Sequence, residues 1–130
     1  MSDKIRTHKD LKIWQRSVEL VTRVYKITES FLNSELFGLT SQIRRASVPI
    51  PSNIAEGSGR KSPKELIQFL HIAIGSIAEL ETQVIIARNL DYIQSDCYKE
   101  LGLELQELIR MTTALIHNLS INNKLIAGNL

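Results

Sequence analysis

Residues 66–87 have the sequence LIQFLHIAIGSIAELETQVIIA, and this stretch decides the fold class. Apolar side chains recur in it at alternating steps of three and four, at Leu66, Leu70, Ala73, Ile77, Leu80, Val84 and Ala87. That spacing places them on one face of an α-helix, whereas a half-buried strand would alternate with a period of two. The stretch therefore predicts a long helix with its apolar stripe against a core.

The same helix carries more apolar surface than one stripe requires. A second stripe is formed by Ile67, Ile74, Ala78 and Ile85. A wide core-facing stripe in a monomer would account for it, but exposed apolar patches of this size more often mark association. We therefore predict a homo-oligomer with these four residues at the interface, and the monomer stays as the alternative.

Three further stretches have the helical period. Their stripes are Leu11, Trp14, Val18, Val21, Tyr25, Thr28 and Leu32, then Leu36, Leu39, Ile43, Ala46, Ile50 and Ile54, then Leu101, Leu105, Leu108, Thr112, Leu115 and Leu119. Short links between long helices make neighbours antiparallel. The chain is predicted to be all-α, an antiparallel up-down-up-down four-helix bundle over residues 11–121, with an N-terminal arm at 1–10 and a C-terminal tail at 122–130.

Two prolines, Pro49 and Pro51, fall inside the second predicted helix. Each lacks the N–H that would bond the carbonyl four residues earlier. Because the apolar stripe keeps its phase across them, we predict a kinked helix and not a loop. Asn53 and Glu56 have the spacing of an N-cap and its reciprocal partner, which predicts that the helix restarts there.

Capping signals mark the other helix starts. Ser62, followed by Pro63 and by Glu65 three residues on, has the order of a capping box. Ser34 and Ser95 are predicted to be the N-caps of the second and fourth helices.

Charge is unevenly distributed along the chain. Residues 1–65 hold 12 Lys and Arg against 7 Asp and Glu, whereas residues 66–130 hold 4 against 7. A basic surface of this kind suits a polyanion or self-association. The residues predicted to contact nucleic-acid phosphates are Lys12, Arg16, Arg44, Arg45, Arg60, Lys61 and Lys64. The alternative is that Glu79 and Glu81 form salt bridges with Arg44, Arg45 or Arg60.

The sequence lacks the residues that several classes of function require. The single Cys97 excludes a disulfide framework and a multi-cysteine zinc site. Gln68 and Ala114 stand where the Glu-x-x-His motif of a di-iron bundle would need glutamates before His71 and His117. No catalytic group can be assembled from spacing. We expect no enzyme activity, cofactor, metal or membrane span, and a cytoplasmic location.

The stretches QIRRASVPIPSNIAEGSGR (42–60) and FLHIAIGSIAELETQ (69–83) resemble the signature of a bacterial four-helix bundle family. That family includes proteins encoded in intervening sequences of 23S ribosomal RNA genes. The chain is also similar to the accessory variability protein of diversity-generating retroelements. Pro49 stands where the family commonly has Ser.

The resemblance implies a pentamer and, for the retroelement relatives, a basic surface that binds nucleic acid and a reverse transcriptase partner. The leading hypothesis is a non-enzymatic oligomeric accessory protein that binds RNA or DNA within a ribonucleoprotein. The alternative is a structural protein–protein interaction module without nucleic-acid binding, which docks another protein through its helix faces.

Overall fold

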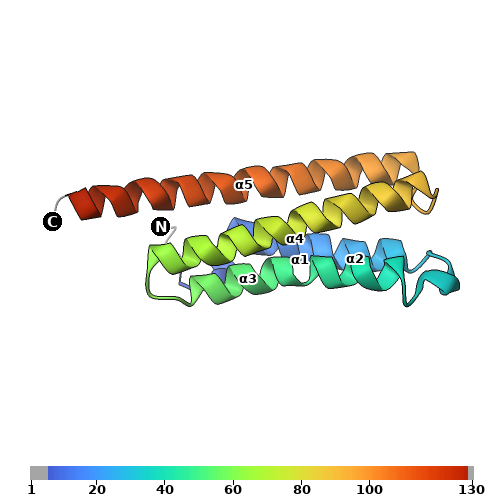
Figure 1. Ribbon diagram of the computed structural model, residues 1–130, viewed down its shortest axis with the longest axis horizontal. Coiled ribbons are helices and arrows are strands. Elements are labelled where there is room, and N and C mark those ends of the chain that lie inside the picture. Colours follow the sequence, from blue (N-terminus) through green and yellow to red (C-terminus); the bar gives the residue numbers. More distant parts are fainter. Residues whose placement is uncertain (1–5, 129–130) are drawn as a thin grey trace.

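The computed structural model describes residues 6–128, with side chains described as far as residue 122. Its elements are the short 3-10 helices η1 (His8–Asp10) and η2 (Asn33–Glu35) and the α-helices α1 (Lys12–Thr28), α2 (Leu39–Ser47), α3 (Pro49–Ser58), α4 (Pro63–Asn89) and α5 (Ser95–Gly128). The described residues contain no strand, and the predicted all-α bundle is confirmed. Helices α2 and α3 follow each other along one line (Figure 1), so together they occupy one position in the bundle.

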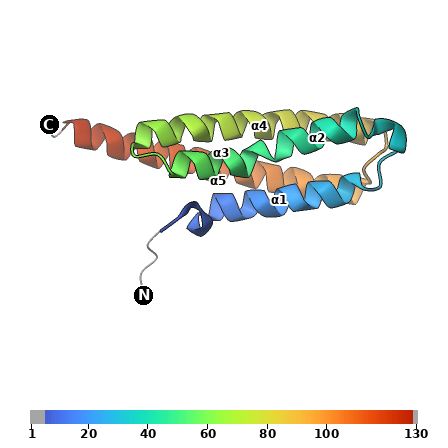
Figure 2. The same ribbon diagram turned by 90° about the horizontal axis from the view of Figure 1, so that it is seen from below.

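The bundle thus has four rods, namely α1, α2–α3, α4 and α5. The chain reverses direction at each connection between them, as Figures 1 and 2 show. Helix α4 packs against α2, α3 and α5, and helix α1 packs against the same three helices. Helices α1 and α4 are thus diagonal to each other. The groove between α4 and α5 therefore lies on the opposite side of the bundle from the groove between α1 and the α2–α3 rod.

The predicted stripes of three rods form the core. Buried side chains include Leu70, Ala73, Ile77, Leu80, Val84 and Ala87 of α4, Ile43, Ala46, Ile50 and Ile54 of α2–α3, and Leu101, Leu105, Leu108 and Thr112 of α5. At the ends of these stripes Leu66, Leu115 and Leu119 are half-buried, and Leu36 is exposed. Uninterrupted aliphatic periodicity thus predicted the inward faces correctly.

Helix α1 differs from its predicted orientation. Its buried residues are Ile13, Ser17, Leu20, Val24 and Thr28. Of the predicted stripe only Thr28 is buried, and Tyr25 is 39% exposed. The hydroxyls of Ser17 and Thr28 donate to the carbonyls of Trp14 and Val24, both at 2.8 Å, which satisfies them inside the core. The remaining apolar residues form what we call the outer α1 stripe: Trp14, Val18, Val21 and Tyr25.

The helix continues through the prolines, as predicted, with an interruption at Val48. Val48 has helical dihedral angles (φ −59°, ψ −40°). Its N–H donates to the Arg44 carbonyl at 3.2 Å, and its own carbonyl accepts from the Ser52 N–H at 3.4 Å. Ile50 is completely buried. The stripe therefore keeps its phase across the break.

The predicted cap at Asn53 is wrong. The Asn53 side-chain amide donates to the Pro49 carbonyl at 2.8 Å, and the Glu56 carboxylate binds Arg60 at 2.6 Å. Helix α3 begins at Pro49. Proline suits the first helical position, because an N–H there would have no partner within the helix. Asn53 and Glu56 therefore lie inside a helix that has already started.

Of the other predicted N-caps, Ser62 is confirmed and Ser34 is wrong. The Ser62 hydroxyl accepts from the Glu65 N–H at 3.2 Å, which confirms the predicted start of α4. Ser34 is wrong as a cap because it lies inside η2, and Gly38 precedes α2. Ser95 is the first residue of α5.

Helix α5 continues to Gly128, beyond residue 121, which we expected to be the last residue of the bundle. Figure 1 shows its C-terminal part extending past the other helices. Residues 1–5 of the predicted arm and 129–130 of the predicted tail lie outside the described residues. The division into arm, bundle and tail remains a prediction.

Candidate nucleic-acid interface

Four of the predicted phosphate contacts lie at one end of the bundle. Lys12 begins α1, Arg60 and Lys61 follow α3, and Lys64 lies in the first turn of α4. All four are exposed, as are two further cations of the N-terminal segment, Arg6 and Lys9. Because η1 packs against both α1 and α3, that segment lies at the same end. We call this surface the basic end: Arg6, Lys9, Lys12, Arg60, Lys61 and Lys64.

Two carboxylates near the basic end have partners of their own. Backbone N–H groups of Arg6 and Thr7 donate to Asp10 at 2.9 and 3.2 Å, which lowers the pKa of Asp10 from its ordinary 3.8. Glu56 pairs with Arg60. Among the described residues, the lysines of the basic end form no ion pair. Their charges are therefore available to an anion.

A shallow hollow of about 490 Å³ opens beside Arg60. It is lined by His8, Ser52, Ala55, Glu56, Gly59 and Arg60. The Arg60 guanidinium lies over the Phe69 ring at 4.9 Å, and the His8 ring meets Trp14 edge-on at 5.1 Å. Each contact holds a polar group on an aromatic surface at the rim of the basic end.

Arg16 lies on a different surface. It lines a narrow crevice between α1 and α5 with Glu104 and Glu107. About two helical turns further along α1, Arg23 forms ion pairs with Glu100 and Glu104. The carboxylates of α5 thus face arginines of α1, and Arg16, although exposed, lies beside two of these carboxylates and apart from the basic end.

Arg44 and Arg45 are also separate from the basic end, because Arg45 precedes Arg60 by fifteen residues, roughly 20 Å along a helix. Arg44 joins α2 to α1. Its Nε donates to Thr28 Oγ1 at 2.9 Å, and its guanidinium lies 4.7 Å from the centre of the Tyr25 ring. Arg45 is exposed.

The predicted salt bridges of Glu79 and Glu81 are not formed within one chain. Ion pairs among the described side chains include neither carboxylate, and they leave Arg45 without one as well. Glu79 accepts a long hydrogen bond of 3.5 Å from Gln83. Glu81 lines the groove between α4 and α5. The reason is geometric, since Glu81 faces α5 on the side of α4 away from the arginines.

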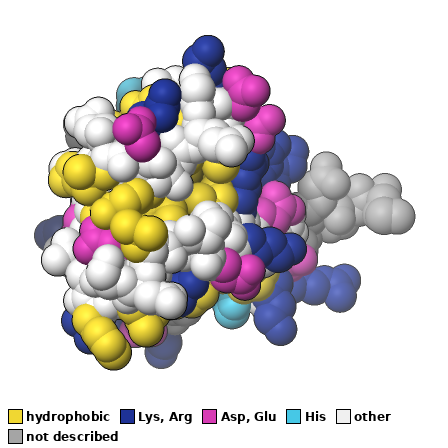
Figure 3. Space-filling model, turned by 90° about the vertical axis from the view of Figure 1, so that its right-hand side faces the viewer, with side chains coloured by type: hydrophobic (Ala, Val, Ile, Leu, Met, Phe, Trp, Pro, Cys, Tyr) yellow, Lys and Arg dark blue, Asp and Glu magenta, His cyan; other side chains and the backbone are white. Residues whose placement is uncertain are grey.

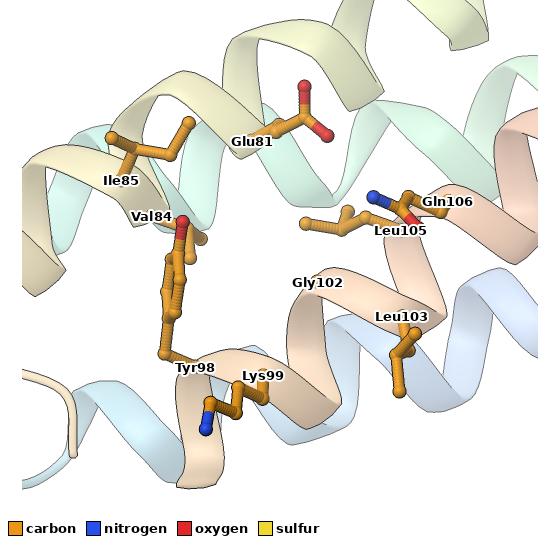
Figure 4. A pocket seen from close by; sticks show the side chains of 9 residues that line it. All are labelled: Glu81, Val84, Ile85, Tyr98, Lys99, Gly102, Leu103, Leu105 and Gln106. Atoms are coloured by element: carbon orange, nitrogen blue, oxygen red, sulfur yellow. The ribbon is translucent and has the colours of Figure 1, made fainter. Parts of the chain in front are cut away.

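That groove, which we call the α4–α5 groove, has a volume of about 610 Å³. Figure 4 shows it bordered by Glu81, Val84 and Ile85 of α4 and by Tyr98, Lys99, Gly102, Leu103, Leu105 and Gln106 of α5. A Cβ added at Gly102 would meet no atom within 4 Å. A second hollow continues from Gln106 along α5 to His117.

Of the predicted interface stripe, only Ile85 is among the residues that line this groove. Ile67 and Ile74 are half-buried, Ala78 is exposed and Ile85 is 42% exposed. An 18-residue window of α4 has a mean hydropathy of 1.4, and only 33% of it is buried. By length and composition alone such a helix could cross a membrane, although a helix inside a bundle meets the same criterion.

The bundle end opposite the basic end carries an apolar patch that sequence reasoning missed. Figure 3 shows hydrophobic side chains across the middle of this end. Its exposed apolar residues are Leu32, Leu36, Phe37 and Leu90, with Phe37 94% exposed. The available signal was Leu36-Phe37, an apolar pair beside a connection.

The model of the family described as 23S rRNA-intervening sequence protein matches residues 9–114. The chain belongs to this family. The match runs from η1 through more than half of α5, so the resemblance predicted from the sequence is confirmed for the 23S rRNA-intervening sequence family.

A solved structure has the same fold as this family member. It is a protein of unknown function from the S23 ribosomal protein family of Bacteroides thetaiotaomicron, with a TM-score of 0.75 and 23% identity. The alignment covers 81% of this chain and 95% of that one. No curated protein matches the chain.

Proposed function

We propose that this 23S rRNA-intervening sequence family member is a non-enzymatic, oligomeric accessory protein that binds RNA or DNA within a ribonucleoprotein. Its main support is the basic end, where cations of the N-terminal segment, α1, the α3–α4 connection and α4 gather and the nearby Asp10 and Glu56 carboxylates already have partners. Lys and Arg side chains neutralise phosphates without reading sequence, so either nucleic acid would bind.

Oligomerisation is supported by the outer surface of α4. Apolar side chains such as Ile85 remain exposed in a single chain, beside a groove that the chain does not fill. A ring of subunits would cover this surface and repeat the basic end around its axis, which turns a modest local charge into a continuous positive band. The resemblance suggests a pentamer.

A second candidate is a protein–protein interaction module without nucleic-acid binding. The exposed patch with Phe37 favours it, since large aromatic side chains anchor protein interfaces. A reverse transcriptase is the partner that the retroelement resemblance suggests. In either case we place the protein in the cytoplasm, without a membrane span.

Fluorescence anisotropy with labelled RNA and DNA at two salt concentrations tests the proposal. For wild type, log K should fall by about 0.7 to 0.9 per neutralised phosphate for each log unit of salt. The double variant Lys61→Glu/Lys64→Glu should bind both nucleic acids more weakly and with a flatter salt dependence. Matched single variants make the same charge change at the two ends of the bundle: Lys61→Glu should weaken binding, whereas Lys26→Glu, near the other end, should keep the wild-type affinity and slope.

Equal losses in Lys61→Glu and Lys26→Glu would contradict a site at the basic end. Absence of wild-type binding at low salt would favour the interaction module. Matching melting temperatures for wild type and every variant show that the variants are folded.

A further inference from the structure

One exposed carboxylate lies among the cations of the basic end. Asp10 follows Lys9 directly, and none of the described side chains forms an ion pair with it. Its negative charge repels a phosphate, so a site that worked by charge alone would bind anions more tightly without Asp10. The hydrogen bonds of Asp10 indicate a different role.

The Asp10 carboxylate organises the backbone of the N-terminal segment, residues 6–10. Its Oδ2 accepts hydrogen bonds from the N–H groups of Arg6 at 2.9 Å and of Thr7 at 3.2 Å. The Thr7 hydroxyl in turn accepts from the Lys9 N–H at 3.2 Å, which completes a capping box around η1. Both cations of the segment, Arg6 and Lys9, thus have their backbone N–H groups bound.

Two further contacts hold this segment on the bundle. The Gln15 side-chain amide, on α1, donates to the Lys9 carbonyl at 2.7 Å, and the His8 ring packs edge-on against Trp14. His8 also forms one wall of the hollow beside Arg60. Residues 6–10 include no buried residue, so the hydrophobic core does not depend on them. The position of the segment therefore affects the surface and not the stability of the bundle.

We infer that Asp10 and Gln15 are positioning residues of the phosphate site, which fix the N-terminal segment so that its two cations stay at the basic end. A segment that is already ordered loses little backbone entropy when nucleic acid binds, and the affinity is higher for that reason. The repulsion from Asp10 is weaker than this gain, because an exposed charge is screened by water and salt. The inference rests on the proposed function and deepens it, since it states how Arg6 and Lys9 are placed.

Two substitutions of Asp10 separate its charge from its hydrogen bonds. Asp10→Asn and Asp10→Ala have the same net charge, but only asparagine keeps a side-chain oxygen that can accept from the backbone. If charge alone mattered, both variants would bind RNA equally and more tightly than wild type. We expect Asp10→Ala to bind labelled RNA about fivefold more weakly than Asp10→Asn does, the effect of losing one cap. Fluorescence anisotropy at one low salt concentration measures this ratio.

Gln15 provides a second test that changes no charge. Gln15→Ala should weaken RNA binding by roughly threefold, because the Lys9 carbonyl loses its partner on α1. Gln68→Ala is the matched control, since it makes the same change at an exposed position of α4. It should bind RNA as wild type does.

Amide hydrogen exchange, measured by NMR, shows whether the segment itself has loosened. The amides of Arg6 and Thr7 should exchange faster in Asp10→Ala than in Asp10→Asn. Unchanged melting temperatures should accompany this difference, because the segment has no buried residue. Faster exchange without weaker RNA binding would overturn the inference.

The inference and the proposed function fail in different ways. Equal RNA binding by Asp10→Asn and Asp10→Ala, while Lys61→Glu binds more weakly than wild type, removes the positioning role and keeps the phosphate site. Absence of wild-type binding at low salt overturns both. Should Asp10→Ala fail to fold, Gln15→Ala decides, and wild-type affinity in that variant overturns the inference.

Discussion

The two sides of helix α4 differ although both are apolar in sequence. Toward α3 the packing is closed, because a Cβ added at Gly57 would lie 2.7 Å from the Phe69 Cβ and 3.0 Å from Leu66 Cδ1. Toward α5 the outer surface is open, with no atom within 4 Å of a Cβ added at Gly102 and with Ile85 exposed. Periodicity shows how many apolar stripes a helix has, whereas the neighbouring helices decide which of them the chain covers.

The largest expected difference between the two sides comes from large-to-small substitutions. Leu80→Ala should lower the free energy of unfolding by about 2 to 5 kcal/mol, because Leu80 is completely buried and its loss leaves a cavity. Ile85→Ala should cost less than about 1 kcal/mol, since its side chain is already partly in water. Urea denaturation at a protein concentration at which the wild type is a single chain measures both losses. Similar losses would show that the α5 side of α4 is as closed as the core.

A smaller difference is expected at the two glycines. Gly57→Ala should destabilise the chain by roughly 1 to 3 kcal/mol, because the new methyl overlaps Phe69. Gly102→Ala should stabilise a single chain by about 0.5 to 1 kcal/mol, since alanine is the better helix former and the space is free. Thermal unfolding of the two variants under the same dilute conditions gives the sign of each change in stability. In otherwise wild-type protein Gly102→Ala should also lower the assembled mass, and a destabilised single chain at Gly102→Ala would contradict an open groove.

The sequence predicted three of the four rods in their correct orientation and missed the fourth for a specific reason. The inward stripes of α2–α3, α4 and α5 consist almost entirely of aliphatic residues. The inward stripe of α1 includes Ser17 and Thr28, whose hydroxyls bond backbone carbonyls of their own helix. A pattern that counts these residues as polar selects the outer α1 stripe instead. Whether a hydrogen-bonded hydroxyl is buried depends on tertiary packing, and the periodicity of the sequence does not report it.

The candidate interface was predictable in part. Lys12, Lys61 and Lys64 flank helix starts at one end of an antiparallel bundle, so chain path alone brings them together. Arg16 and Arg44 depend on the rotation of α1 about its axis, which brings Arg16 beside Glu107 and Tyr25 beside Arg44. The rotation of α4 likewise places Glu81 toward α5, away from the arginines of its own chain. The spacing of residues along one helix cannot predict how that helix is rotated relative to its neighbours.

The molar mass of the wild-type chain in solution tests the central claim most directly, namely that the open side of α4 is covered by another copy. Size-exclusion chromatography with multi-angle light scattering at micromolar concentration should give a multiple of the 14.7 kDa chain mass, with five copies expected from the family resemblance. A mass of 14.7 kDa over the whole micromolar range would contradict the claim.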